Sequence, residues 1–71
     1  MTDKRKSNLA YAASEAWYAI AKARGLSLPQ TGTAHYAFPF RRYAVLVQAT
    51  PNLWAVSVYG VGGEYITSIA A

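Results

Sequence analysis

The chain has 71 residues, of which 54% are hydrophobic, 14% aromatic and 14% charged, and its formal net charge is +4. This composition excludes a disordered chain, which would be poor in aromatic residues, and the lack of cysteine excludes a disulfide framework. Since Ser14 and Glu15 break the apolar run after the basic start, and no stretch approaches the ~18 uncharged apolar residues of a membrane span, we expect a cytoplasmic protein without a secretory signal.

The first predicted element is a helix near the N-terminus. Residues 9–23 are alanine-rich and contain neither glycine nor proline, which favours helix. Ser7 is the expected N-cap, and Gly25 is expected to end the helix in the left-handed conformation. One side of this helix should face a core, because apolar residues recur at helical spacing. The residues expected on that side are Leu9, Ala13, Ala16, Ile20 and Ala23, with Trp17 on the flank.

The second half of the chain has the period-two pattern of β-strands. Residues 41–49, 53–60 and 64–70 are rich in Val, Ile, Tyr and Trp and are expected to form an antiparallel meander. Residues 35–38 form a candidate edge strand, which Pro39 stops because proline cannot donate to a ladder. We therefore expect a sheet of three to four strands.

Two short turns set the expected register of this sheet, one at Pro51-Asn52 and one at Gly62-Gly63. The cross-strand pairs that they imply are Val45 with Val58, Val47 with Val56, Val58 with Thr67, and Val56 with Ile69. One side of the meander is then a continuous apolar face, which also includes Tyr65. The helix is its obvious cover, so the predicted fold is α+β, with one N-terminal helix on an antiparallel meander.

The opposite side of the meander has few charges for a solvent-exposed surface. A chain with one helix has nothing left to cover it, so we expect a homodimer to bury it. A half-exposed face with a few tolerated apolar residues is the alternative interpretation. The residues expected in the dimer interface are Ala44, Leu46, Ala55, Ser57, Tyr59 and Ile66.

Side chains for catalysis or metal binding are scarce in this sequence. His35 is the only histidine, and there are only three acidic residues. A metal needs several such ligands, and a general base needs a group to orient it, so we expect no metal, no cofactor and no enzyme activity. A small nuclease that uses His35 with Arg41 or Arg42 on a phosphodiester is the remaining catalytic alternative.

Positive charge is the most specific functional signal. Seven Lys or Arg residues outnumber three Asp or Glu residues, and part of this excess lies at residues 1–7, which we expect to be a flexible basic arm ahead of a single domain at 8–71. The residues expected to contact nucleic acid are Lys4, Arg5, Lys6, Lys22, Arg24, Arg41 and Arg42. Such side chains bind phosphates irrespective of base sequence, and a twofold dimer matches the symmetry of duplex DNA.

We therefore expect a small basic homodimer that binds double-stranded DNA mainly through phosphate contacts, with low sequence selectivity and an architectural or regulatory role. Some dimeric DNA-binding proteins of bacteria combine a basic arm, a helix and an antiparallel ribbon in the same way, which is an analogy at the level of the fold. The alternative is a protein–protein interaction module that acts as an inhibitor or adaptor of a larger complex. We expect no membrane binding, because the helix lacks the basic polar face of membrane-surface helices.

Overall fold

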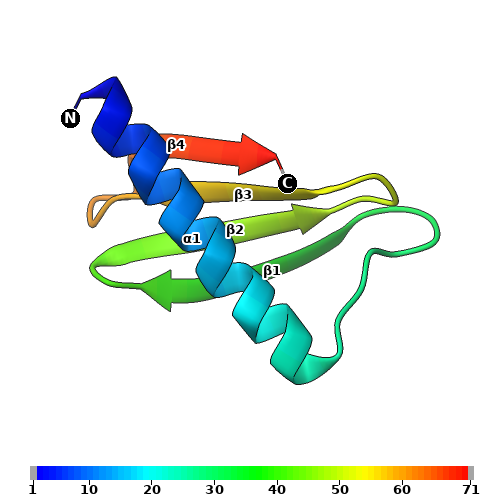
Figure 1. Ribbon diagram of the computed structural model, residues 1–71. Helices are drawn as coiled ribbons and strands as arrows, with labels where there is room; N and C mark the ends of the chain where they lie inside the picture. Colours follow the sequence, from blue (N-terminus) through cyan, green and yellow to red (C-terminus); the bar gives the residue numbers. More distant parts are fainter. Residues whose placement is uncertain (1, 71) are drawn as a thin grey trace.

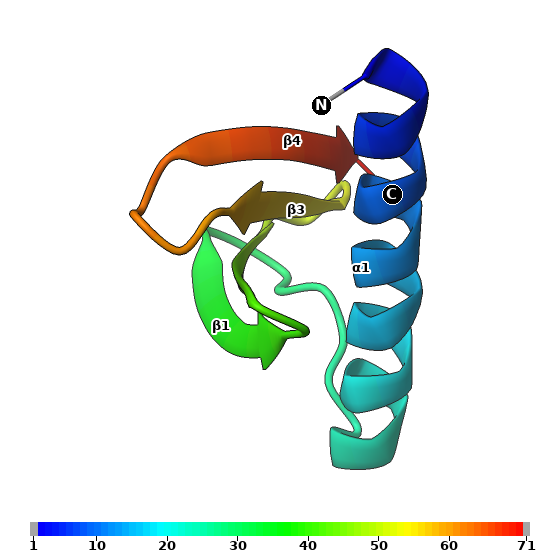
Figure 2. The same ribbon diagram turned by 90° about the vertical axis from the view of Figure 1, so that its left-hand side faces the viewer.

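The computed structural model describes residues 2–70 and shows one helix on a four-stranded antiparallel sheet (Figure 1). In chain order the elements are α1 (Asp3–Arg24), β1 (Ala34–Phe40), β2 (Tyr43–Ala49), β3 (Trp54–Tyr59) and β4 (Tyr65–Ala70). Strands that follow one another in the chain are neighbours in the sheet, so β1 and β4 are its edges. The helix crosses one face of the sheet diagonally, and within residues 2–70 no element covers the other face (Figure 2). The predicted α+β class is confirmed.

The helix begins at Asp3, well before the predicted start after Ser7. Thr2 is the N-cap, and its Oγ1 accepts a hydrogen bond of 3.2 Å from the backbone N–H of Arg5. Lys and Arg are good helix formers, and nothing in residues 3–7 interrupts a helix. The segment predicted as a flexible arm therefore forms the first turns of α1. The first residue of that predicted arm lies outside the described residues.

The C-terminal end of α1 agrees with the prediction. Gly25 adopts the left-handed conformation with φ 67°. Its N–H donates to the carbonyl of Lys22 at 3.2 Å, and the N–H of Leu26 donates to the carbonyl of Ala21 at 2.8 Å. These two bonds form a Schellman motif, which ends the helix and turns Leu26 back toward the core. Within the described chain, no helical segment combines the length and apolar character that crossing a bilayer requires.

The core lies between α1 and the inner face of the sheet, which is the face toward the helix. Its largest buried side chain is Trp17, 1% exposed, which the sequence placed on the flank of the helix. The ring centroid of Trp17 lies 5.0 Å from that of Tyr36 and 5.3 Å from that of Trp54, so aromatic residues of the sheet surround it. Ala23, predicted to face the core, is exposed. The buried core positions of α1 are Leu9, Ala13, Trp17 and Ala21.

The predicted cross-strand register is present between β2 and β3 and over most of β4. The confirmed pairs are Val45 with Val58, Val47 with Val56, Val58 with Thr67, and Val56 with Ile69. The turn at Pro51-Asn52 is also confirmed, because the N–H of Thr50 donates to the carbonyl of Leu53 at 3.1 Å. Hydrophobic alternation and one correctly identified turn were enough to fix the centre of the sheet.

Strand β1 is longer than predicted, since it continues through Pro39 to Phe40. An edge strand tolerates proline where its missing N–H would have pointed away from the sheet. Phe40 pairs with Tyr43, so Arg41 and Arg42 form the β1–β2 turn rather than the start of β2.

The β3–β4 connection is longer than the predicted two-residue turn. The N–H of Gly60 donates to the carbonyl of Glu64 at 2.8 Å, and the N–H of Gly63 donates to the carbonyl of Gly60 at 2.9 Å. The loop therefore comprises residues 61–63. Gly63 has φ 85°, the left-handed conformation that the last position of a three-residue hairpin loop requires.

A β-bulge compensates for this longer loop and exchanges two side chains between the faces. Tyr59 pairs with Tyr65, whereas the next pair is Val58 with Thr67, so Ile66 is the extra residue. Tyr65, predicted on the inner face, is 59% exposed and contacts Tyr59 on the opposite face. Ile66, predicted in the dimer interface, packs against the core instead.

Candidate nucleic-acid interface

A basic cleft of about 360 Å³ lies where the start of α1 meets the β1–β2 turn. Arg5 and Asn8 line it from the helix, Arg41 and Arg42 line it from the turn, and Tyr43 lines it from the start of β2. The start of α1 and this turn lie at the same end of the molecule in Figure 1, which we call the basic end. The fold thus brings together guanidinium groups that are far apart in the sequence.

The β1–β2 turn places its arginines over aromatic rings. Arg41 has φ 56°, and no other described residue except glycine has a positive φ. The Cζ of Arg41 lies 4.8 Å from the centroid of the Phe40 ring, and the Cζ of Arg42 lies 5.6 Å from that of Tyr43. A guanidinium that stacks on a ring keeps its N–H edge directed outward, so it remains able to donate to an anion.

Both residues and backbone make the start of α1 electropositive. Lys4, Arg5 and Lys6 occupy its first turns, where the helix dipole already favours anions. Each cation there destabilises the helix by about 0.3–1 kcal/mol at low salt, and Asp3 offsets only part of this. A bound anion would relieve the repulsion. This end of the helix is therefore more stable with a phosphate bound than without one.

The structure divides the predicted nucleic-acid contacts between two ends of the molecule. Lys4 and Lys6 share the basic end with Arg5 but do not line the cleft. Lys22 and Arg24 lie in the last turn of α1, at the far end of a 22-residue helix that is about 33 Å long. Cations there complement the negative end of the helix dipole, which gives them a structural role of their own.

The outer face of the sheet, which points away from α1, carries no formal charge at its strand positions. Cross-strand pairs arrange its side chains in three rows, His35–Gln48–Ala55–Ala70, Ala37–Leu46–Ser57–Ser68 and Pro39–Ala44–Tyr59–Tyr65. The predicted interface residues Ala44, Leu46, Ala55, Ser57 and Tyr59 lie on it. Ile66 does not lie on the outer face, because the β-bulge directs its side chain toward the core.

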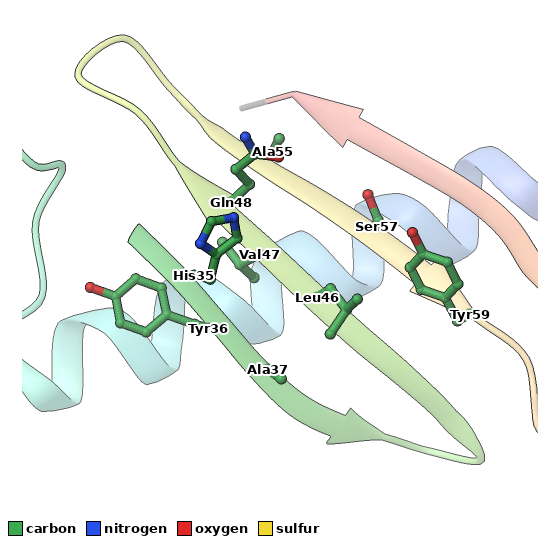
Figure 3. A pocket seen from close by; sticks show the side chains of 9 residues that line it. All are labelled: His35, Tyr36, Ala37, Leu46, Val47, Gln48, Ala55, Ser57 and Tyr59. Carbon is green, nitrogen blue, oxygen red and sulfur yellow. The ribbon is translucent and has the colours of Figure 1, made fainter. Parts of the chain in front are cut away.

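A hollow of about 370 Å³ opens on this outer face. Small side chains such as Ala37 and Ala55 form its floor, and Leu46 and Tyr59 stand at one side (Figure 3). His35 lies at the other side next to its cross-strand partner Gln48. The hollow is mostly apolar with a few polar groups at its margin.

His35 lies far from Arg41, with which the nuclease alternative would pair it on one phosphodiester. Along β1, His35 is about 20 Å from Arg41, since a strand rises about 3.3 Å per residue. A nuclease site that uses both residues on one phosphodiester would need them within hydrogen-bond reach of the same group. Among residues 2–70, no group of His, Cys, Asp or Glu side chains could hold a metal ion.

Fold and site together define an α+β protein with a basic cleft at one end and an uncharged, uncovered sheet face. Comparison with known proteins gives no match to a family model, to a curated protein or to a solved structure. Its function is therefore inferred from the chemistry of these two surfaces.

Proposed function

We propose that this protein is a homodimer that binds double-stranded DNA mainly through phosphate contacts, with low sequence selectivity and an architectural or regulatory role. The observation that carries the proposal is the convergence of Arg5, Arg41 and Arg42 on one cleft at the positive end of α1. Guanidinium groups match phosphate oxygens in geometry as well as charge.

Low selectivity follows from the composition of the cleft. Arginine and lysine bind phosphate oxygens irrespective of the base, and these contacts position a protein on the duplex. Asn8 is the one amide side chain of the cleft, and it is the residue best suited to read a base edge. A single such contact supplies little discrimination, so unrelated duplexes should bind with similar affinity.

A dimer strengthens this function because two basic ends contact one duplex. Cleft residues on two copies neutralise more phosphates, and the number of phosphates neutralised sets both affinity and salt dependence. A twofold axis in the protein also matches the pseudo-symmetry of the DNA backbone. A role on DNA is consistent with the cytoplasmic location that we propose for this chain.

The proposal can be tested with a matched pair of double variants. Arg41→Gly/Arg42→Ala removes two positive charges from the cleft, and Lys22→Ala/Arg24→Ala removes two from the far end of α1. Both variants therefore change the net charge equally. Fluorescence anisotropy with a labelled duplex of random sequence at ~100 mM salt measures the affinity of each.

We expect the cleft variant to lose about tenfold or more in affinity, and the far-end variant to lose less than about threefold, because phosphate contacts act locally. Equal losses would show that only net charge matters and would contradict a defined binding surface. Circular dichroism of both variants serves as the control for folding.

The uncharged outer face favours a second candidate, a protein–protein interaction module that acts as an inhibitor or adaptor of a larger complex. An apolar hollow without formal charge is suited to bind a protein rather than a polyanion. A stoichiometric complex with one partner that persists at ~1 M salt, together with no affinity for DNA at low salt, would support this candidate over the first.

A further inference from the structure

The outer face has complementary features at its two ends. Tyr59 and Tyr65 form a ridge in the row next to the basic end, with ring centroids 5.8 Å apart at an interplanar angle of 73°. The Tyr65 hydroxyl lies 2.7 Å from Ser68 Oγ, which fixes the direction of its ring. The hollow extends from beside this ridge to the row of His35 and Gln48 at the opposite end of the strands.

We infer that the outer face of a second copy packs on this face, so that Tyr59 of each copy enters the other's hollow beside Ala55, and Tyr65 packs next to it on Ala70. The inference rests on the homodimer of the proposed function and names the side chains that meet. A twofold axis between the two sheets and across their strands exchanges the two ends of the face. The ridge of each copy then faces the small side chains Ala55 and Ala70 of the other, in both copies at once.

The charge distribution permits this contact between two copies that each carry a net charge of +4. The formal charges of the described chain lie on α1, on the β1–β2 turn and at Glu64 beyond the end of β3, and none lies in the rows of the outer face. Two copies therefore meet without burying an unpaired charge, which would oppose association strongly.

The size of the face is adequate for a stable dimer. Four strands spaced about 4.8 Å apart and about 20 Å long give a projected area on the order of 400 Å². The relief of the ridge and hollow makes the accessible area larger than this projection, toward the ~800 Å² per partner that standard interfaces bury.

This arrangement places the two basic ends at opposite ends of the dimer, because the axis exchanges the ends of the strands. Each cleft lies at one end of strands about 20 Å long and on the helix side of its own sheet, and packed sheets lie about 10 Å apart, so the two clefts are on the order of 30 Å apart. This separation is close to one turn of B-DNA, which is about 34–36 Å.

The test compares two tyrosines of similar exposure. Tyr65, 59% exposed, belongs to the ridge, and Tyr11, 62% exposed, lies on α1. Sedimentation equilibrium over ~10 µM to 1 mM should give a dimer for the wild type. We expect Tyr65→Ala to raise the dimer dissociation constant at least about tenfold and Tyr11→Ala to leave it unchanged, because hot-spot aromatic residues dominate interfaces.

A second variant guards against misfolding of the first. Gln48 is exposed and lines the hollow, so Gln48→Glu adds a charge there at nearly constant shape. We expect this variant to keep the wild-type circular dichroism spectrum and to dissociate into monomers. A wild type that stays a monomer at ~1 mM, or equal effects of Tyr65→Ala and Tyr11→Ala, would overturn the inference.

DNA binding separates failure of this interface from failure of the proposed function. A monomeric Gln48→Glu variant keeps its cleft, so it should bind duplex with about half the wild-type salt slope. The cleft variant Arg41→Gly/Arg42→Ala should lose about tenfold or more in affinity for the duplex and remain a dimer. If the wild type is a monomer and Tyr65→Ala instead weakens binding of a single-stranded oligonucleotide, the ridge stacks on bases and the dimer inference is wrong.

Discussion

Replacing Arg41 by glycine or alanine separates the charge of the basic cleft from the strain of its turn. Arg41 has φ 56°, a conformation that costs an L-residue about 1–2 kcal/mol. Alanine keeps this strain, whereas glycine relieves it and loses about 0.5–1 kcal/mol through the greater entropy of the unfolded chain. Both substitutions remove the contact of Arg41 with the Phe40 ring, worth about 0.5–1 kcal/mol at an exposed site.

The difference between the two variants is therefore predictable. Arg41→Gly should be more stable than Arg41→Ala by about 0.5–1 kcal/mol, since only the strain and entropy terms differ. In a domain of this size that corresponds to about 2–8 °C in Tm, which thermal unfolding followed by circular dichroism resolves. The two variants should bind DNA with the same affinity, each with a log–log salt slope about 1.8 less steep than the wild type, because each of the two copies in the homodimer loses one phosphate contact.

Two results would refute this reasoning. Equal stability of the two variants would mean that the positive φ of Arg41 is not a source of strain. Unchanged DNA affinity in both would remove Arg41 from the interface. The combination we expect, with glycine more stable and affinity reduced in both, would indicate that an arginine is kept at a position suited to glycine because its charge is needed.

Three further predictions concern the core, the helix end and the DNA. Trp17 is buried with its Nε1 unpartnered in the described chain, so Trp17→Phe should change the free energy of unfolding by about 1 kcal/mol or less in urea titration, whereas Trp17→Ala should cost about 3–5 kcal/mol. Gly25→Ala should lower stability by about 1 kcal/mol, because Gly25 has φ 67° and a Cβ there meets no neighbouring atom, so only backbone strain opposes it. A duplex of about 20 base pairs should bind much more tightly in anisotropy than one of about 8, which cannot reach two basic ends.

The fold could be predicted from the sequence to the extent that local signals were unambiguous. Alternating Val residues and the Pro51-Asn52 turn determine the pairing of β2 with β3, and Gly25 determines where α1 ends. The predicted start of α1 was wrong because Ser7 and Thr2 are both residue types that favour the N-cap position. With Thr2 as the N-cap, the helix continues through Lys4, Arg5 and Lys6. The repulsion between these three cations does not prevent helix formation.

The candidate site could be predicted only in part, because it depends on two features without a local signal. A glycine-rich loop can contain two or three residues with little change in sequence, and the three-residue form required a bulge that exchanged Tyr65 with Ile66. The arginines were identified as functional candidates by charge alone. Their convergence with Arg5 required knowing that α1 starts early and crosses the sheet next to the β1–β2 turn.

The most direct test of the central claim is the salt dependence of duplex binding by the wild-type protein. The account predicts binding to unrelated duplexes with similar affinity, and a slope of log K against log salt near −5, as expected if about six phosphates are neutralised. Absence of binding at about 50 mM salt would contradict it, and so would an affinity that does not change with salt.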